Sequence, residues 1–496
     1  MSHPPTHDAP KRHAQHHAPG HGHDHFHGHG HQDYPQAAAD PRRWAALALL
    51  CLAQFMLILD VTVVNVALPD IAADLGLGRS TLTWVVTSYT LCFGGLMLLG
   101  GRLADALGAR TTLIAGLALF TAASLTAGLA GSAAVLLGAR AAQGVGAALL
   151  SPSALSLVTT GFPDEERTKA LGVWAGIGGA GSAAGVLLGG ALTSGPGWHW
   201  IFYVNVPVGA AVLALVPVLV RARAPRPARL DLPGALLVTT GTAAIVYGLL
   251  KAGDAGWGSG RTLLPLALAV LLYAAFAVVE RRGRSPLMDV TMLTRRPVVA
   301  GAFLMLVATG LLVSSFFLGS VYLQQIRGLS ALRTGLLFLP VAVTTALGAH
   351  LAGRLLAVAG ARTVAAGGMA VAALGLAPPA RLTGGTGWFP LTAGFALAGL
   401  GIGAVFVTAI TTALSLVEPE KSGLASGVVN TFHEVGGSIG VAVVSTVAAT
   451  GIARGTVPGF AHAFTVTAAA AAASAALCVL VVPRGRLEMS GVPHAH

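Results

Sequence analysis

The chain has 496 residues, of which 54% are hydrophobic and only 10% are charged, and its formal net charge is +11. A soluble globular domain carries about 25% charged residues, so this composition excludes a water-exposed surface over most of the chain. Three cysteines stand singly within apolar stretches, which argues against a disulfide framework or a cysteine-ligated metal site. The sequence therefore indicates an integral membrane protein.

The first 43 residues differ from the rest of the chain. Eleven histidines lie between His3 and His31 among Gly, Pro and Asp, so we expect a disordered, cytoplasmic tail over 1–43. Imidazole ligates Zn²⁺ or Ni²⁺, and six alternating histidines form a weak candidate metal site: His21, His23, His25, His27, His29 and His31. A soluble tail with incidental metal affinity is the simpler interpretation.

Fourteen apolar stretches follow between Trp44 and Val482. Each has about 20 residues, the length with which an α-helix crosses the hydrocarbon core of a bilayer. Helix is expected because lipid offers no partners to free backbone groups. The predicted spans are 44–67, 82–100, 111–130, 134–157, 169–192, 201–220, 233–251, 262–280, 298–323, 333–355, 363–380, 388–413, 422–448 and 460–482.

The distribution of lysine and arginine predicts the orientation. With the N-terminus in the cytoplasm, most of the 30 Lys and Arg residues lie on the inner side of the membrane. We therefore expect both termini, including the tail 483–496, to be cytoplasmic in a multi-pass cell-membrane protein. This bias also accounts for most of the net charge, so a nucleic-acid partner is not needed to explain it.

Two basic connections divide the membrane part. They lie near 221–229 and 280–297 and enclose two spans, which predicts a six-helix bundle over 44–220, an inserted pair over 221–297 and a second six-helix bundle over 298–482. An internal repeat supports this division, as expected for a transporter with duplicated halves. The motif Gly101-Arg102-Leu103 with Gly108 and Arg110 recurs at the same spacing as Gly353-Arg354-Leu355 with Gly360 and Arg362.

Asp60 lies inside the first predicted span. An intramembrane carboxylate costs several kcal/mol unless it faces the bundle interior or is protonated, so we expect a proton carrier. A structural hydrogen bond between helices, assisted by Asn65, is the alternative. Arg140 is the one Lys or Arg within a span, and helical rise places it at a depth similar to that of Asp60, so the two are expected to meet. Gln143 lies near Arg140 on the same helix.

His433 and Glu434 fall near the middle of the thirteenth span, the depth at which transporters place their sites. We assign Glu434 to proton coupling and His433 to the substrate cavity, together with Asn65 and Gln143. Adjacent helical residues point about 100° apart, so His433 and Glu434 need not line one cavity.

The fifth span is rich in glycine. Gly181, Gly185 and Gly189 recur every four residues and form a smooth face on which another helix packs closely. With Gly190, they are candidates for helix packing and gating.

The residues now described resemble the major facilitator superfamily, in its drug:proton antiporter branch with fourteen spans. The resemblance covers Trp44 to about Val482. It rests on the segment 59–69 around Asp60, the loop motif between spans two and three, the fourth-span motif of Arg140, Gln143, Gly144 and Gly146, the segment 198–207, and Asp231-Leu232-Pro233-Gly234.

The resemblance implies roles for several of these residues. The loop motif would form a cytoplasmic latch, in which Asp105 caps a neighbouring helix and pairs with an arginine, and Arg140 would take part in proton coupling. The residues of the latch are Gly101, Arg102, Asp105, Gly108 and Arg110.

The sequence also departs from the family pattern. The fifth-span motif normally carries Gly-Pro, but Val186 follows Gly185 here, which weakens the prediction of antiport. The second copy of the loop motif has Ala357 at the position of Asp105. His433 and Glu434 stand where the branch often has Arg and Gln, which suggests an individual substrate preference.

We therefore expect an all-α integral membrane protein of 14 transmembrane helices, with two six-helix bundles and an inserted pair. It would export lipophilic or cationic drugs by alternating access, driven by the proton gradient without a cofactor, as a monomer. An exporter of a metal ion or metabolite fed by the tail is the alternative, and a channel is a further one. A membrane-embedded enzyme is disfavoured, because His433-Glu434 is followed by Gly437 where a second histidine would complete a His-Glu-x-x-His zinc motif.

Overall fold

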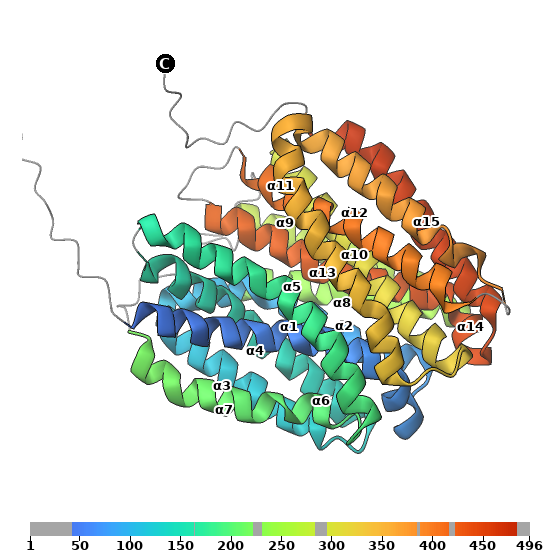
Figure 1. Ribbon diagram of the computed structural model, residues 1–496, viewed down its shortest axis with the longest axis horizontal. Coiled ribbons are helices and arrows are strands. Elements are labelled where there is room, and N and C mark those ends of the chain that lie inside the picture. Colours follow the sequence, from blue (N-terminus) through green and yellow to red (C-terminus); the bar gives the residue numbers. More distant parts are fainter. Residues whose placement is uncertain are drawn as a thin grey trace, which may run out of the picture. The chain divides into compact units, whose positions relative to one another are not determined.

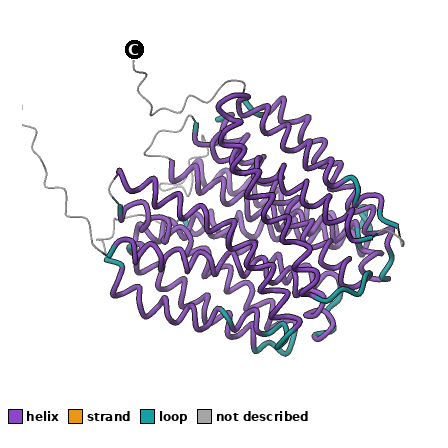
Figure 2. The backbone as a smooth tube through the Cα atoms, viewed as in Figure 1, coloured by secondary structure: helices purple, strands orange, loops and turns teal. Residues whose placement is uncertain are grey.

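The computed structural model describes residues 42–162, 164–221, 231–282, 295–383, 387–415 and 422–483. These residues are helical apart from short connections, and no strand occurs among them (Figures 1 and 2). The predicted all-α class is confirmed for this part of the chain.

The first seven helices follow the six spans predicted for the N-terminal half, the sixth span being divided into α6 and α7. Their bounds are α1 Arg43–Asp74, α2 Arg79–Leu107, α3 Ala109–Gly128, α4 Ala133–Gly161, α5 Asp164–Ser194, α6 Trp200–Tyr203 and α7 Asn205–Leu219. Within this group α1 packs on α5, and α3 packs on both α4 and α7 (Figure 1).

The remaining helices comprise the inserted pair and the C-terminal half. Their bounds are α8 Leu232–Ala255, α9 Gly260–Arg282, α10 Arg296–Val321 continued by a π turn η2 at Tyr322–Ile326, α11 Ala331–Leu376, a 3₁₀ turn η3 at Pro379–Arg381, α12 Trp388–Leu414, α13 Ser422–Val447, α14 Ala449–Arg454 and α15 Val457–Val481. Helix α11 packs on α12 and α15, and α8 packs on α9 (Figure 1).

Eleven helices in the described part of the chain are long and apolar enough to cross a membrane. The protein is therefore a multi-pass membrane protein. Helix α1 extends beyond the predicted end at residue 67, because tertiary contacts hold the extra turns. Ile71 is fully buried there, and the Trp198 indole nitrogen donates a hydrogen bond to Asp74 Oδ2 at 3.0 Å.

The two copies of the loop motif adopt the same backbone geometry. Gly108 has a φ of 90° between α2 and α3, and Gly360 has a φ of 76° inside α11, a conformation that residues with a Cβ rarely adopt. Arg110 Nη2 donates to the carbonyl of Pro217 near the end of α7 at 3.1 Å, and Arg362 Nη2 donates to that of Val482 just after α15 at 2.7 Å. Each arginine thus binds the C-terminal end of the last helix in its half.

Paired glycines set the same helix crossing in both halves. A Cβ on Gly116 of α3 would lie 2.7 Å from the carbonyl oxygen of Gly146 in α4, and one on Gly368 of α11 would lie 2.8 Å from that of Gly401 in α12. Because backbone would clash with a side chain at these points, only glycine permits such close approach.

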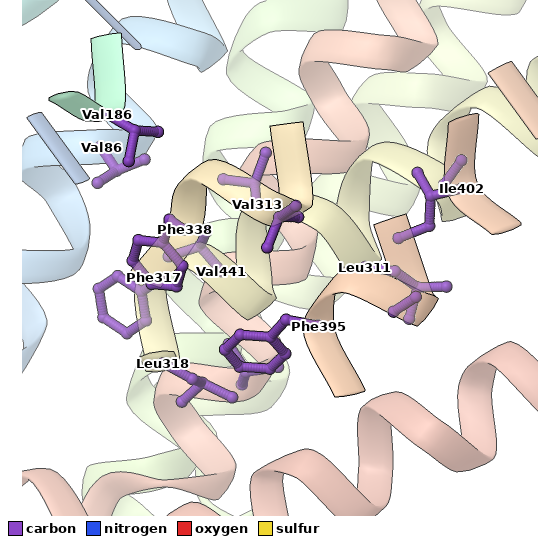
Figure 3. Packing of buried hydrophobic residues seen from close by; sticks show 14 of the residues in the cluster. Val86, Val186, Leu311, Val313, Phe317, Leu318, Phe338, Phe395, Ile402 and Val441 are labelled. Atoms are coloured by element: carbon purple, nitrogen blue, oxygen red, sulfur yellow. The ribbon is translucent and has the colours of Figure 1, made fainter. Parts of the chain in front are cut away.

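The largest buried apolar cluster contains residues of both halves. Figure 3 shows Phe338 and Phe317 beside Val86 of α2 and Val186 of α5, with Phe395 further along the cluster. The ring centroids of Phe338 and Phe395 are 6.1 Å apart. These stacked rings lie in the buried apolar core of the C-terminal half.

Polar contacts join the halves near the helix ends opposite to the start of α1 and the end of α15. Ser194 Oγ accepts a hydrogen bond from the Leu332 backbone nitrogen at 2.9 Å, and Gln324 Nε2 donates to the Val66 carbonyl at 2.7 Å. Arg79 at the start of α2 donates to the Ser445 carbonyl of α13 at 3.1 Å. The two halves are therefore fastened to each other at this end.

Candidate functional site

Asp60 and Arg140 form an ion pair between α1 and α4. Asp60 Oδ2 lies 2.5 Å from Arg140 Nη1, and both side chains are excluded from solvent. The predicted meeting of these residues therefore occurs in the structure. Burial removes both charged groups from water, so a buried ion pair needs further hydrogen bonds to offset the loss of hydration.

Amide side chains supply those further hydrogen bonds to the carboxylate. Gln143 Nε2 and Asn205 Nδ2 each donate to Asp60 Oδ1 at 3.1 Å, and Arg140 Nη1 donates to Gln143 Oε1 at 2.9 Å. The Ser124 hydroxyl lies 2.8 Å from Gln143 Nε2 and accepts from it. Asp60 is thus held by three donors from α4 and α7, and the whole network is buried.

The guanidinium of Arg140 has a second set of contacts, to α2 and α6. Its Nε donates to the Val85 carbonyl at 3.1 Å, and the Tyr89 ring centroid lies 4.4 Å from Cζ. The Phe202 ring lies farther away, at 5.9 Å. Gly144 allows this approach, because a Cβ there would lie 2.4 Å from the Tyr89 carbonyl oxygen. Aromatic faces stabilise a desolvated cation by up to about 2 kcal/mol.

Sequence reasoning did not identify three members of this site, namely Ser124, Tyr89 and Asn205. Asn205 lies in the segment 198–207 that resembles the family. A polar amide at the start of an apolar helix could have marked it as a hydrogen-bonding residue of the site. Ser124 and Tyr89 carry no comparable signal, because serine and tyrosine are common in apolar helices and only packing brings these two to Arg140 and Gln143.

Asn65 does not join the Asp60 network. Its Nδ2 donates to the Val61 carbonyl of the same helix at 2.8 Å, and its Oδ1 is buried without a hydrogen-bond partner among the described residues. The alternative in which Asn65 assists a hydrogen bond from Asp60 is therefore not realised in this conformation.

His433 and Glu434 of α13 pack on different helices, although His433 Nε2 and Glu434 Oε1 lie 3.9 Å apart. His433 Nδ1 is hydrogen-bonded to Thr309 Oγ1 at 2.8 Å, and its ring lies 5.5 Å from that of Phe406. Glu434 instead packs on Gly94 of α2, where a glycine Cβ would lie 2.4 Å from the Glu434 Cβ. The His433 side chain is 37% exposed and the Glu434 side chain 13%, so both reach an accessible space.

The loop motif between α2 and α3 makes fewer contacts than the resemblance implies. Arg110 binds the end of α7, as described above, and Gly101 lies in ordinary contact with Pro152 of α4. Asp105 is exposed, and its carboxylate has no hydrogen-bond or ion-pair partner within the ranges that the structure describes. Arg102 is half-buried. In this conformation the expected pairing of Asp105 with an arginine is not formed between described residues.

The glycines of α5 face two different helices. Gly181, Gly185 and Gly189 pack against α1, where a Cβ on Gly189 would lie 3.0 Å from the Val63 Cα. Gly190 packs against α11 of the other half, where a Cβ would lie 2.7 Å from the Leu332 Cα. The smooth glycine face therefore packs closely on α1, and Gly190 marks a contact between the halves.

Val186 occupies the place of the proline found in the family motif. Its side chain is fully buried, and its carbonyl oxygen would lie 2.5 Å from a Cβ on Gly335 of α11. The helix continues through this position as far as Ser194. The substitution thus leaves α5 regular where it crosses the other half.

No group of three or more His, Cys, Asp or Glu side chains that could hold a metal ion occurs among the described residues. The six histidines proposed as a weak metal site, His21 to His31, lie outside the described residues. The metal assignment therefore stays a prediction from sequence.

Comparison with curated proteins gives several relatives of nearly full length. The chain is 42% identical to a puromycin resistance protein of Streptomyces alboniger, over 86% of this chain and 88% of the relative. It is 40% identical to a cephamycin export protein of Amycolatopsis lactamdurans, over 82% and 85%. It is 36% identical to a multidrug resistance protein of Mycobacterium tuberculosis, over 80% and 74%.

Solved structures with the same fold are more distant in sequence. An autoinhibited peptide transporter of the POT family matches with a TM-score of 0.67 and 18% identity, over 90% of this chain and 99% of that one. A bacterial homologue of the human lysosomal transporter Spinster, inward-facing and unoccupied, matches with a TM-score of 0.58 and 19% identity, over 89% and 96%.

The family model described as Major Facilitator Superfamily matches residues 50–441 and again 331–491. Together with the relatives, this match confirms the family predicted from the motifs and makes the chain a membrane transporter rather than an enzyme. The chain belongs to the Major Facilitator Superfamily.

Proposed function

We propose that this transporter exports lipophilic or cationic small molecules, antibiotics among them, in exchange for protons. The observation that carries the proposal is the solvent-excluded ion pair of Asp60 and Arg140. Its carboxylate has the placement that a membrane proton carrier requires. The names of the relatives, which include a puromycin resistance protein and a cephamycin export protein, support the substrate class.

The proposed cycle alternates protonation of Asp60 with occupancy by substrate. Protonation removes the negative charge that Arg140 faces, so the guanidinium loses its counter-ion, and neutral partners such as the Val85 carbonyl, the Gln143 amide and the Tyr89 ring remain. The network must then rearrange, because a buried charge without a counter-ion is costly. Glu434 supplies a second carboxylate, on which a cationic substrate is held. The proton gradient is the energy source, and no cofactor is required.

We infer that three further segments cross the membrane beside the eleven helices described above, which gives the predicted fourteen crossings. Helices α5 and α13 have 31 and 26 residues, which is long enough to span. Gly360 divides α11 into a segment of 29 residues, 331–359, and a second that reaches 21 residues, 361–381, when the 3₁₀ turn η3 is included, so that both have spanning length. We assign six spans before the inserted pair and six after it to two bundles. The shared geometry of the two loop motifs and of the matched glycine pairs supports this assignment.

We further propose that both termini are cytoplasmic and that the described conformation faces inward. The contacts between the halves, at Ser194, Gln324 and Arg79, lie at the helix ends opposite to the start of α1 and the end of α15. With cytoplasmic termini, these contacts close the outer side of the transporter. Rocking of the two bundles would break them and open the site outward, in a monomer that works alone.

The decisive experiment replaces Asp60 by asparagine, which preserves size and hydrogen bonding but cannot take up a proton in the physiological range. In inverted membrane vesicles with an imposed pH gradient, we expect Asp60→Asn to lower proton-driven uptake of ethidium or puromycin by about 10²-fold or more. Asp70→Asn is the matched control, because Asp70 is exposed near the end of the same helix, and it should retain transport. Undiminished proton-driven transport by Asp60→Asn would remove Asp60 from the mechanism.

A further inference from the structure

Helix α8 of the inserted pair lies along the boundary between the two halves. It packs on both α2 and α13, which belong to different halves (Figure 1). In its first turn Ala235 is buried in one cluster with Leu99 of α2. Near its other end the Leu249 carbonyl accepts a hydrogen bond from Thr446 Oγ1 of α13 at 2.6 Å. The inserted pair is therefore in contact with both halves at once.

Arg79, the first residue of α2, joins these three helices. Its Nη1 donates to the Ser445 carbonyl of α13 at 3.1 Å, and its Nη2 donates to the Leu250 carbonyl of α8 at 3.3 Å. Nη2 also forms an ion pair with Asp254 in the last turn of α8. The Arg79 side chain is only 7% exposed, and a guanidinium withdrawn from water needs a counter-ion. Asp254 and the negative end of the α8 dipole supply it.

The last turn of α8 leaves room for this guanidinium. A Cβ on Gly253 would lie 3.0 Å from Arg79 Nη2 and 3.2 Å from Thr446 Cγ2, so a larger residue there would press on both side chains. Lys251 Nζ lies 4.0 Å from the second oxygen of the Asp254 carboxylate. The end of α8 is thus shaped and charged to hold Arg79 between α2 and α13.

The bonds of Arg79 lie where the halves must separate in the proposed cycle. In the proposed orientation these are the outer ends of α2 and α13, which Thr83 Oγ1 and Ser445 Oγ also join at 2.7 Å. The bond between Thr446 and Leu249 holds α8 on α13 independently of Arg79. Movement of α2 away from α13 therefore withdraws Arg79 from both of its neighbours together.

We propose that α8 is a strap that holds the outer side of the transporter closed, and that Asp254 secures it by binding Arg79. When the outer side opens, α8 stays with α13, Arg79 leaves with α2, and the ion pair breaks. The strap therefore favours the inward-facing state, in which the transporter takes up substrate from the cytoplasm. This inference rests on the orientation and rocking motion of the proposed function, and it gives the inserted pair a part in that motion.

The test uses Asp254→Ala, which removes both the charge and the acceptor that hold Arg79. Because 45% of the Asp254 side chain is exposed, the replacement leaves no buried cavity. Asp70→Ala is the matched control, because it removes an exposed acid from the same end of α1 without touching the strap. The readout is how often the outer side opens.

A cysteine at Thr87 reports that opening, in a background whose three native cysteines are replaced by alanine. Thr87 of α2 is fully buried, and its hydroxyl donates to the Thr83 carbonyl of its own helix at 3.0 Å. It lies between Thr83 and Thr90, whose hydroxyls are both bonded to α13. A membrane-impermeant maleimide, added outside whole cells, reaches Thr87→Cys when α2 and α13 separate on that side.

We expect Asp254→Ala to raise the rate of labelling about fivefold, as loss of an ion pair that is partly open to water implies. Asp70→Ala should leave the rate unchanged. Arg79→Ala should also raise the rate, and Asp254→Ala should add nothing in that background, because Asp254 acts through Arg79.

Two results would overturn the inference. One is labelling of Asp254→Ala at the rate of the protein that retains Asp254, and the other is a full additional effect of Asp254→Ala in the Arg79→Ala background. Absence of proton-driven ethidium transport by the wild-type protein would instead count against the proposed function. The labelling needs no proton gradient, so the two failures are distinguishable.

Discussion

Arg140 makes contacts of three kinds at once, with a carboxylate, a backbone carbonyl and an aromatic face. The planar guanidinium satisfies these directions together, whereas a lysine ammonium would supply the charge but not the Nε bond to Val85. This geometry also fixes the Asp60 carboxylate, whose other donors are the amides of Gln143 and Asn205. The pair is therefore a single unit, and its members are not independently replaceable.

Replacement of Arg140 by alanine tests whether the ion pair stabilises the folded protein. The variant leaves the Asp60 carboxylate buried with amide donors but without its counter-ion, which costs about 3–5 kcal/mol. We expect a clearly lower thermal unfolding temperature in detergent at neutral pH. Combining Arg140→Ala with Asp60→Asn should restore most of the loss, because no buried charge remains. A double variant no more stable than Arg140→Ala would contradict the ion pair as the cause.

At the scale of helices, close crossings depend on glycines whose Cβ would meet backbone. Gly144 is the one nearest the site, because it brings α4 against the Tyr89 carbonyl of α2 and so sets the distance from Arg140 to the Tyr89 ring. Gly138, on the same helix, lies at no such crossing. Gly138 has no atom within 4 Å of the position that a Cβ would take.

Gly144→Ala and Gly138→Ala form a matched pair on this helix. Gly144→Ala should separate α4 from α2 and destabilise the protein by about 1–3 kcal/mol, as overpacking of a close contact does. Gly138→Ala should be neutral or stabilising by up to about 1 kcal/mol, since alanine favours helix over glycine. Thermal unfolding in detergent provides the comparison, and equal melting of the two variants would show that the crossing at Gly144 is not tight.

The sequence was most informative about helices and least about side-chain partners. Apolar runs of spanning length predict helices because lipid permits no other backbone structure, and even the break at Gly360 falls between two predicted spans. The meeting of Asp60 with Arg140 followed from their similar depths. The contribution of Tyr89 did not follow, because it depends on which face of α2 packs against α4, and periodicity is weak in helices that are apolar on every side.

For the whole molecule, the contacts between α5 and α11 hold one end of the two halves together. Ser194 Oγ and the Leu332 backbone nitrogen are 2.9 Å apart, and Gly190 and Gly335 keep the helices close on either side. If the proposed orientation holds, separation of these helices is the step that exposes the site to the outside.

A cross-link at this contact tests the proposed rocking motion. In a background whose Cys51, Cys92 and Cys478 are replaced by alanine, the pair Ser194→Cys and Leu332→Cys should form a disulfide on mild oxidation. We expect oxidation to abolish proton-driven transport in vesicles and a reductant to restore it, while each single cysteine variant stays insensitive to both. Full transport by the cross-linked protein would show that the helices need not separate.

The glycine pairs that match between the halves also reveal where the halves have diverged. Gly144 of α4 corresponds to Gly399 of α12, each packed on a backbone carbonyl of an earlier helix, Tyr89 of α2 in one case and Val341 of α11 in the other. Four residues before these glycines stand Arg140 and Phe395, the first in the charged network and the second in the aromatic cluster (Figure 3). At this matched position one half therefore carries a buried ion pair, and the other a buried aromatic cluster. If the Asp60–Arg140 pair couples transport to protons as proposed, substitutions among those rings would alter the packing of their own half and leave the ion pair in place, so the two halves can vary separately.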